Sequence, residues 1–125
     1  IKLHRITKDE RYRLAYEWLY HEQLKNHPRL KCGSFWHKAI YPNQMWLDGA
    51  FMVLPFMAMY GIIKNDRSII IDAILQMMNI RDVMLDKETG LYYHGYDETK
   101  SMLWADEKTG LSSQFWLRSN GFVEL

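Results

Sequence analysis

The 125-residue sequence predicts a mostly helical domain in which a buried helix packs against a half-exposed helix. Three observations support this. A helix start signal with an apolar face follows residues 7–10, residues 51–63 carry no charge, and a turn at residues 65–66 leads straight into a further helical pattern. A buried helix joined to a half-exposed one by a short turn is the pairing expected of an inner and an outer helical layer.

The first helix is predicted from a capping box, Thr7-Lys8-Asp9-Glu10. Thr7 would be the N-cap, and Glu10 would reach back to it. The helix should end near Asn26, because Pro28 disfavours helical backbone at the residue before it. Residues 32–42 then form a loop.

The second helix is predicted from about Gln44 to Ile63, with Pro55 as a possible kink. Its length and hydropathy would also suit a membrane span, but Asp48, Gly49 and Pro55 favour a buried helix. A carboxylate that enters a buried helix is costly to desolvate unless it is paired or protonated. Two readings of Asp48 are equally open from this pattern: a general acid/base, or a carboxylate favoured by the helix dipole.

The third helix should run from Arg67 to about Leu85, capped by Asn65-Asp66, with Asp72 and Gln76 facing water. Its buried side is predicted to hold the apolar residues of the periodic pattern, which are Ile70, Ala73, Ile74, Met77, Met78 and Ile80.

Two similar turns follow, at residues 86–91 and 106–111, each with Asp, Thr and Gly in the same places. Glycine at the fifth position of each suits the positive φ of a tight turn. Residues 91–94 are expected to form a short strand, and a last helix should begin at Ser112 or Ser113.

Composition excludes several classes of function. With 16 basic and 15 acidic residues there is no signature of polyanion binding, so no nucleic-acid partner is expected, and one cysteine excludes an internal disulfide. His37 and His94 have no second ligand at metal-binding spacing, and no glycine-rich phosphate loop is present, so no metal or cofactor is expected. The remaining carboxylates, histidines, arginine and aromatics suit acid/base chemistry on carbohydrate.

Three of these candidates have a structural alternative. His94 is either a substrate ligand or a loop histidine, and Arg118 either grips a uronate carboxylate or forms a plain ion pair. Asp97-Glu98 is expected to be a solvated turn rather than a catalytic pair.

Several blocks of the sequence resemble glycoside hydrolase family 105, the unsaturated rhamnogalacturonyl hydrolases, in order and spacing over nearly the whole chain. These blocks are Phe35-Trp36-His37-Lys38, Tyr41-Pro42-Asn43-Gln44-Met45-Trp46-Leu47-Asp48-Gly49, Pro55-Phe56, Tyr93-His94-Gly95-Tyr96-Asp97-Glu98 and Phe115-Trp116-Leu117-Arg118-Ser119-Asn120-Gly121. The resemblance implies an all-α fold, a sector of an (α/α)₆ toroid with a short strand-like loop ribbon. Residues 1–125 would then be a partial domain, truncated at both ends, whose partners are an oligosaccharide and the remainder of the parent chain.

The same resemblance implies that Asp48 is the catalytic acid/base. It would protonate C4 of a 4,5-unsaturated uronic acid and help water to add at C5. Burial would raise the pKa of Asp48 and the helix N-terminus would lower it. The substrate-binding residues implied are His37, Trp46, His94, Trp116, Arg118 and Phe122.

Some features depart from the family pattern. A second aspartate of the family's pocket would lie upstream of Ile1, and the common Phe-Trp-Gly-Arg-Gly-Asn-Gly-Trp block here has Leu117, Ser119 and Phe122. Two alternatives therefore stay open: a family 88 unsaturated glucuronyl hydrolase acting on glycosaminoglycan products, and a truncated, non-catalytic sugar-binding toroid. Trp46-Leu47-Asp48-Gly49 favours family 105. The compartment is not determined, and the cytoplasm or periplasm of a bacterium is the expectation.

Overall fold

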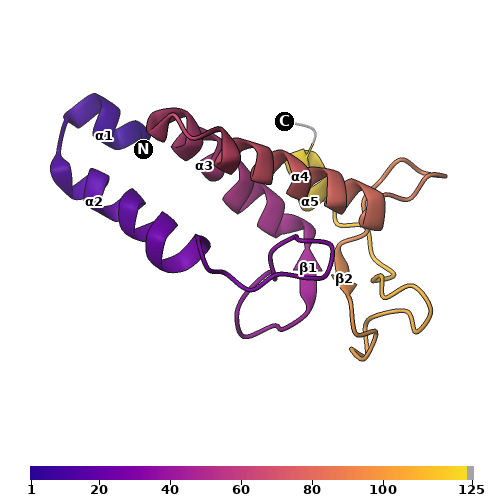
Figure 1. Cartoon of the computed structure of the whole chain (residues 1–125). Coiled ribbons are helices and arrows are strands. Elements are labelled where there is room, and N and C mark those ends of the chain that lie inside the picture. The colour runs from indigo at the N-terminus through magenta and orange to yellow at the C-terminus, as the bar shows by residue number, and fades with distance from the viewer. Residues whose placement is uncertain (124–125) are drawn as a thin grey trace.

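The computed structural model of the chain describes the backbone of residues 1–123 and the side chains of residues 1–121. In chain order the elements are α1 (Lys2–Thr7), α2 (Glu10–Trp18), the π-helical turn η1 (Leu19–Leu24), β1 (Gln44–Trp46), α3 (Leu47–Lys64), α4 (Arg67–Met84), β2 (Gly95–Asp97) and α5 (Leu117–Val123) (Figure 1). The antiparallel pair of α3 and α4 is the centre of the molecule. The segments that carry β1 and β2 gather at the end where α3 begins and α4 ends.

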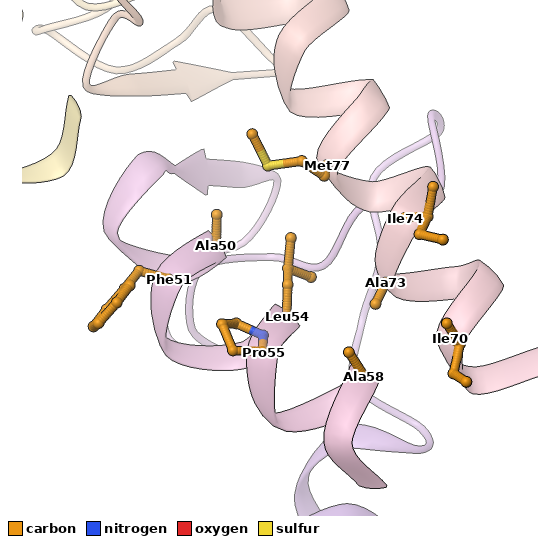
Figure 2. A pocket seen from close by; sticks show the side chains of 9 residues that line it. All are labelled: Ala50, Phe51, Leu54, Pro55, Ala58, Ile70, Ala73, Ile74 and Met77. Carbon is orange, nitrogen blue, oxygen red and sulfur yellow. The ribbon is translucent and has the colours of Figure 1, made fainter. Parts of the chain in front are cut away.

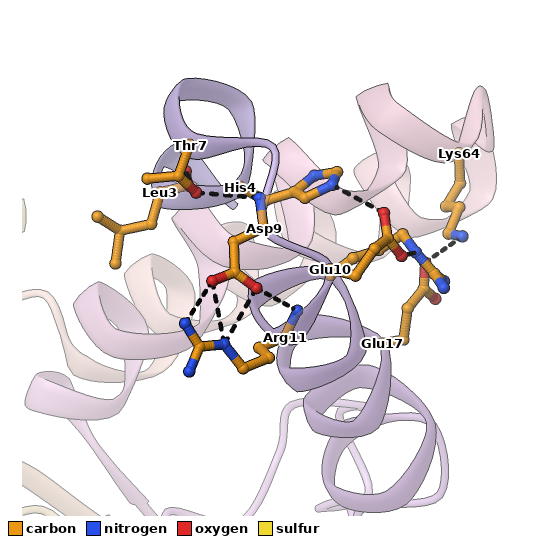
Figure 3. A network of polar contacts seen from close by, with 9 residues as sticks. Leu3, His4, Thr7, Asp9, Glu10, Arg11, Glu17 and Lys64 are labelled. Atoms are coloured by element: carbon orange, nitrogen blue, oxygen red, sulfur yellow. Dashed lines mark hydrogen bonds and ion pairs between the residues drawn. The ribbon is translucent and has the colours of Figure 1, made fainter.

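The N-terminal helical region is capped differently from the prediction. Asp9 is the N-cap of α2, because its carboxylate accepts a hydrogen bond from the Arg11 backbone N–H at 2.9 Å. Thr7 instead ends α1, where its hydroxyl donates to the carbonyl of Leu3, and Glu10 pairs with side chains rather than reaching back (Figure 3). The predicted capping box was wrong because a separate short helix occupies residues 2–7.

The second predicted helix begins three residues late. Residues 44–46 form β1, which pairs antiparallel with β2 in the register Gln44↔Asp97 to Trp46↔Gly95. α3 then starts at Leu47 and continues through Pro55 to Lys64. By length and composition α3 could also cross a membrane, but in this structure it packs along α4.

The predicted boundaries of α4 are confirmed, with Asp66 as its N-cap, but its buried face is turned from the predicted one. Gln76 is buried at 3% exposure instead of facing water, since its side-chain oxygen accepts from the Phe35 backbone N–H at 3.0 Å. Ile74 and Met78 are more than half exposed. Gln76 therefore lies on the inner face of α4, where hydrophobic periodicity predicted only apolar residues.

The two similar turns form as predicted, with Gly90 at φ +74° and Gly110 at φ +81°. In each, the aspartate side chain accepts from the threonine hydroxyl three residues on, and the glycine N–H donates to the aspartate carbonyl. Other expectations for this region were wrong. The strand lies at 95–97 rather than 91–94, and the last helix begins at Leu117, because Ser112 is held by Gly95 through its backbone and side chain.

Two clusters of buried residues form the core, one where α2 and η1 meet α3 and α4, the other beneath the two-stranded sheet. The first contains Tyr16, Leu24, Met57, Tyr60, Ile69 and Ala73, and the second contains Leu30, Met45, Leu47, Ala50, Ile80 and Met84. Another side of the α3–α4 pair carries an open groove that is lined by apolar side chains (Figure 2).

Gly61 lies where α3 closely approaches the start of α4. A Cβ at this position would lie 2.7 Å from Ile70 Cγ1 and 2.9 Å from the Asp66 carbonyl oxygen. We therefore expect Gly61→Ala to lower the free energy of unfolding by about 1–3 kcal/mol through overpacking, despite alanine's better helix propensity. Urea denaturation measures this. Gly121→Ala is the control, because an added Cβ there meets no described atom within 4 Å, and equal stability of the two variants would refute the expectation.

Candidate active site

Asp48 lies in the first turn of α3, and its carboxylate is held by two residues of α5. Arg118 donates to it through Nη2 at 2.9 Å and Nε at 3.3 Å, and the Ser119 hydroxyl donates to Oδ1 at 2.8 Å. The side chain of Asp48 is 19% exposed and that of Arg118 is 57% exposed. The ion pair therefore sits at a surface, with its carboxylate on the protein side and its guanidinium partly open to solvent.

The pKa of Asp48 is lowered from its ordinary value. The largest cause is the hydrogen bond from Arg118; burial acts in the opposite direction, and Ser119 adds to the lowering. The sequence had set burial against the helix N-terminus, whereas here a cation of another helix decides the direction. In this arrangement Asp48 is ionised at neutral pH.

His94 lies beside this pair and is 5% exposed. Its ring stacks on Trp116 with centroids 3.6 Å apart, and its Nδ1 lies 3.5 Å from the Ser119 hydroxyl. Its backbone is fixed on both sides, since its carbonyl accepts from Leu47 N–H and its N–H donates to the carbonyl of Gln114. Burial lowers the pKa of His94, so the ring is neutral.

An aromatic wall continues from His94. Trp46 meets His94 edge-on at 5.0 Å, and His37 and Tyr41 both lie nearly parallel to the Trp46 ring, at 5.2 and 6.0 Å. Trp104 approaches Trp46 edge-on from the loop after β2. Flat rings beside a charged pair offer both stacking and polar contact to a sugar.

His37 is fixed in this wall by the start of α3. Its backbone N–H donates to the Gln44 carbonyl at 2.7 Å, and a Cβ on Gly49 would lie 3.2 Å from its Nδ1. Burial lowers the pKa of His37, and Lys38 adds to this. Because Gly49 has no side chain, the His37 imidazole can pack against the first turn of α3.

Five of the six predicted substrate-binding residues, together with Asp48, gather at this end of α3. Arg118 binds Asp48 directly, His94 and Trp116 stack beside this pair, and Trp46 and His37 continue the wall. The side chain of Phe122 lies outside the described residues. Among the residues that the structure describes, no three His, Cys, Asp or Glu side chains cluster in a way that could hold a metal ion.

The expectation of a solvated turn at Asp97-Glu98 was wrong for Asp97. This side chain is 1% exposed and accepts from the backbone N–H groups of Thr99, Ser101 and Met102. Asp97 therefore organises the loop after β2 and does not face the site.

Two residues of the site were not predicted, Ser119 and Asn120. Ser119 is fully buried, and the only signal for it in the sequence was its departure from the glycine common in the resembled pattern. The Asn120 amide joins α5 to the segment before His94: its oxygen accepts from Tyr92 N–H at 2.7 Å, and its nitrogen donates to the Tyr92 and Trp116 carbonyls. This clamp holds Trp116 in register with His94.

Asn120→Asp is expected to destabilise the protein by about 2–3 kcal/mol, because a carboxylate oxygen would then face two carbonyl oxygens in a buried place without a proton to share. The change should appear as a lower midpoint in thermal unfolding. Asn26→Asp, in an exposed turn, makes the same chemical change as a control. Equal midpoints for both variants would show that the clamp does not stabilise the fold.

The fold is helical, and the site joins a charged pair to a wall of aromatic rings. Residues 1–125 match Glycosyl Hydrolase Family 88 along their whole length, and the chain belongs to this family.

Individual proteins and solved structures that are similar to the chain agree with this family. The chain is 28% identical over 128 residues to the unsaturated rhamnogalacturonyl hydrolase YesR of Bacillus subtilis (strain 168), a match that covers 98% of this chain and 35% of YesR. Among solved structures, a glycoside hydrolase from family 105 of C. acetobutylicum ATCC 824 matches with a TM-score of 0.92 at 41% identity, over 98% of this chain and 34% of that one. A possible family 105 member from Salmonella enterica, at 23% identity and a TM-score of 0.77, shares the fold.

These matches confirm the resemblance and the fold class. The chain forms part of the α/α toroid of families 88 and 105, with a small two-stranded sheet, and spans about a third of the length of the relatives it matches.

Proposed function

We propose that the protein containing this chain hydrolyses oligosaccharides that end in a 4,5-unsaturated uronic acid, with Asp48 as the general acid/base. The observation that carries the proposal is the Asp48–Arg118 pair at 2.9 Å, set against the stacked rings of His94 and Trp116. YesR, whose name describes an unsaturated rhamnogalacturonyl hydrolase, supports the same substrate class.

Arg118 would bind the carboxylate of the unsaturated uronate. Its guanidinium uses Nε and Nη2 on Asp48, and within the described part of the chain Nη1 makes no hydrogen bond. The Cζ atom lies over the Trp116 ring, 4.9 Å from its centroid, and the Arg118 side chain is partly exposed. A guanidinium fork matches a carboxylate, which makes Arg118 the best anion site beside Asp48.

Binding of the uronate would also prepare Asp48 for its role. While Arg118 serves Asp48 alone, the carboxyl is ionised. A second carboxylate on the same guanidinium divides its positive charge, and two neighbouring carboxylates raise the pKa of one of them. Asp48 would take up a proton in this way as the substrate enters.

The reaction then proceeds by hydration of the vinyl ether. The Asp48 carboxyl gives its proton to C4, and the positive charge that develops at C5 is shared with the ring oxygen. Water adds at C5 and returns a proton to the Asp48 carboxylate. The hemiketal so formed opens and releases the neighbouring sugar. The reaction as a whole consumes one water and restores Asp48 to its starting state.

The aromatic wall would hold the sugar rings. Trp116 is 40% exposed beside Arg118, and the parallel rings of His37, Tyr41 and Trp46 extend the surface. Such stacking orients a sugar without adding charge near C5.

Loss of the ultraviolet absorbance of the conjugated uronate tests the proposal directly. The full-length protein is mixed with an unsaturated rhamnogalacturonan disaccharide, and separately with an unsaturated chondroitin disaccharide. Loss of absorbance with the pectin product supports the proposal. Loss with the chondroitin product alone would move the assignment to an unsaturated glucuronyl hydrolase, and activity on neither would refute both.

A further inference from the structure

Ser119 lies between Asp48 and His94. It is 0% exposed, and its Oγ lies 2.8 Å from Asp48 Oδ1 and 3.5 Å from His94 Nδ1. The first contact is a short hydrogen bond to a charged acceptor, and the second is a longer one within a closed environment. No other serine within the described residues contacts either group.

The protons on this chain of three groups can be assigned from the charges. Asp48 is ionised by Arg118 and can only accept, so the single hydroxyl proton of Ser119 goes to Oδ1. The side of Oγ that faces His94 is then a lone pair. His94 is neutral with one N–H, and a hydrogen bond to that lone pair places the proton on Nδ1.

This assignment leaves Nε2 of His94 without a proton. Nε2 is fully buried and has no hydrogen-bond partner among the described residues. Trp116 stacks on the ring and Trp46 meets it edge-on, so the imidazole is held in a closed place where the hydrogen bond to Ser119 decides the tautomer.

We propose that Ser119 is a positioning residue for the reaction: it holds Oδ1 of Asp48 as an acceptor, reserves Oδ2 for the proton that goes to C4, and fixes His94 with its proton on Nδ1. This proposal rests on the proposed function. It follows from the division of the carboxylate, in which Arg118 makes its shorter contact with Oδ2 and Ser119 contacts Oδ1 alone. Once Arg118 binds the uronate, Ser119 still donates to Oδ1, and Oδ2 is left as the oxygen that carries the proton.

Ser119→Ala in the full-length protein tests it. Loss of one hydrogen bond to a charged group should lower kcat about tenfold. It should also raise the pKa of Asp48, because a donor that stabilises the carboxylate is removed. Since Asp48 acts in its protonated form, the fall of kcat/KM with rising pH should move to higher pH. Ser119→Cys, which keeps a weak donor, should recover part of both effects.

Ser34→Ala is the matched control. Ser34 is also buried, at 1% exposure, and its hydroxyl has no partner among the described residues, so neither kcat nor the pH profile should move. A Ser119→Ala enzyme with the pH profile of Ser34→Ala would overturn the proposal and leave the proposed function intact. Thermal unfolding of both variants separates an unfolded protein from a changed site.

A readout independent of turnover tests the histidine. Nitrogen-15 NMR of labelled histidine, with His94 assigned through His94→Asn, should show a protonated Nδ1 in the parent and a changed tautomer balance in Ser119→Ala. A His94 protonated on Nε2 in the parent would refute the inferred chain even if the enzyme acts on no tested disaccharide.

Discussion

Asp48→Asn is expected to lower kcat about 1000-fold on the unsaturated disaccharide that the protein accepts, because general acid/base catalysis supplies about 10²–10⁴-fold and asparagine can neither give nor take the proton. The substitution keeps the shape of the side chain. Its amide oxygen can still accept from Ser119, so the site should stay folded and KM should change far less than kcat. Initial rates by ultraviolet absorbance, with the thermal midpoint beside them, measure both.

Asp82→Asn is the control for this change. Asp82 lies on the exposed side of α4, so its substitution also removes one negative charge, but away from the site. Asp48→Asn turning over at the rate of Asp82→Asn would remove Asp48 from the chemistry, and the ion pair with Arg118 would then be structural only.

The sequence predicted the helices well where one physical signal dominated. The bounds of α4 follow from the Asp66 N-cap and an unbroken periodic pattern, and the uncharged run gives α3 as a buried helix. The start of α3 was missed because Gln44 to Trp46 are paired with residues fifty positions later in β2. Local propensity carries no information on such pairing. Gln76 was misplaced for the same reason: its partner, Phe35 N–H, lies in a distant loop.

The site shows the same division. Asp48 stood out as a lone carboxylate beside an uncharged run, and the ordered blocks of residues brought His37, Trp46, His94, Trp116 and Arg118 with it. Their mutual contacts depend on tertiary structure. The sequence allowed Arg118 a role towards the substrate or in an ion pair, and the fold places it on Asp48 at 2.9 Å. Ser119 was not predicted as a site residue, because its role depends on contacts with Asp48 and His94, which are distant from it in sequence.

Arg118→Gln should reduce kcat/KM about 100-fold, mostly through KM, since charge-assisted hydrogen bonds contribute about 1.5–3 kcal/mol each and 1.4 kcal/mol corresponds to a factor of ten. The pH profile should move as well. Arg118 is the main cause of the lowered pKa of Asp48, so its removal raises that pKa. An acid works below its pKa, and the fall of kcat/KM with rising pH should therefore shift to higher pH.

Arg118→Lys separates the two effects. Lysine keeps the positive charge beside Asp48 but loses the planar fork, so KM should rise while the fall of kcat/KM with rising pH stays near that of the parent. Arg81→Gln, at an exposed place in the last turn of α4, removes one positive charge elsewhere and should change neither. An unchanged KM in Arg118→Gln would refute the uronate contact. An unmoved pH profile in the same variant would mean that a group other than Asp48 supplies the proton, because no described residue controls the Asp48 carboxyl as strongly as Arg118 does.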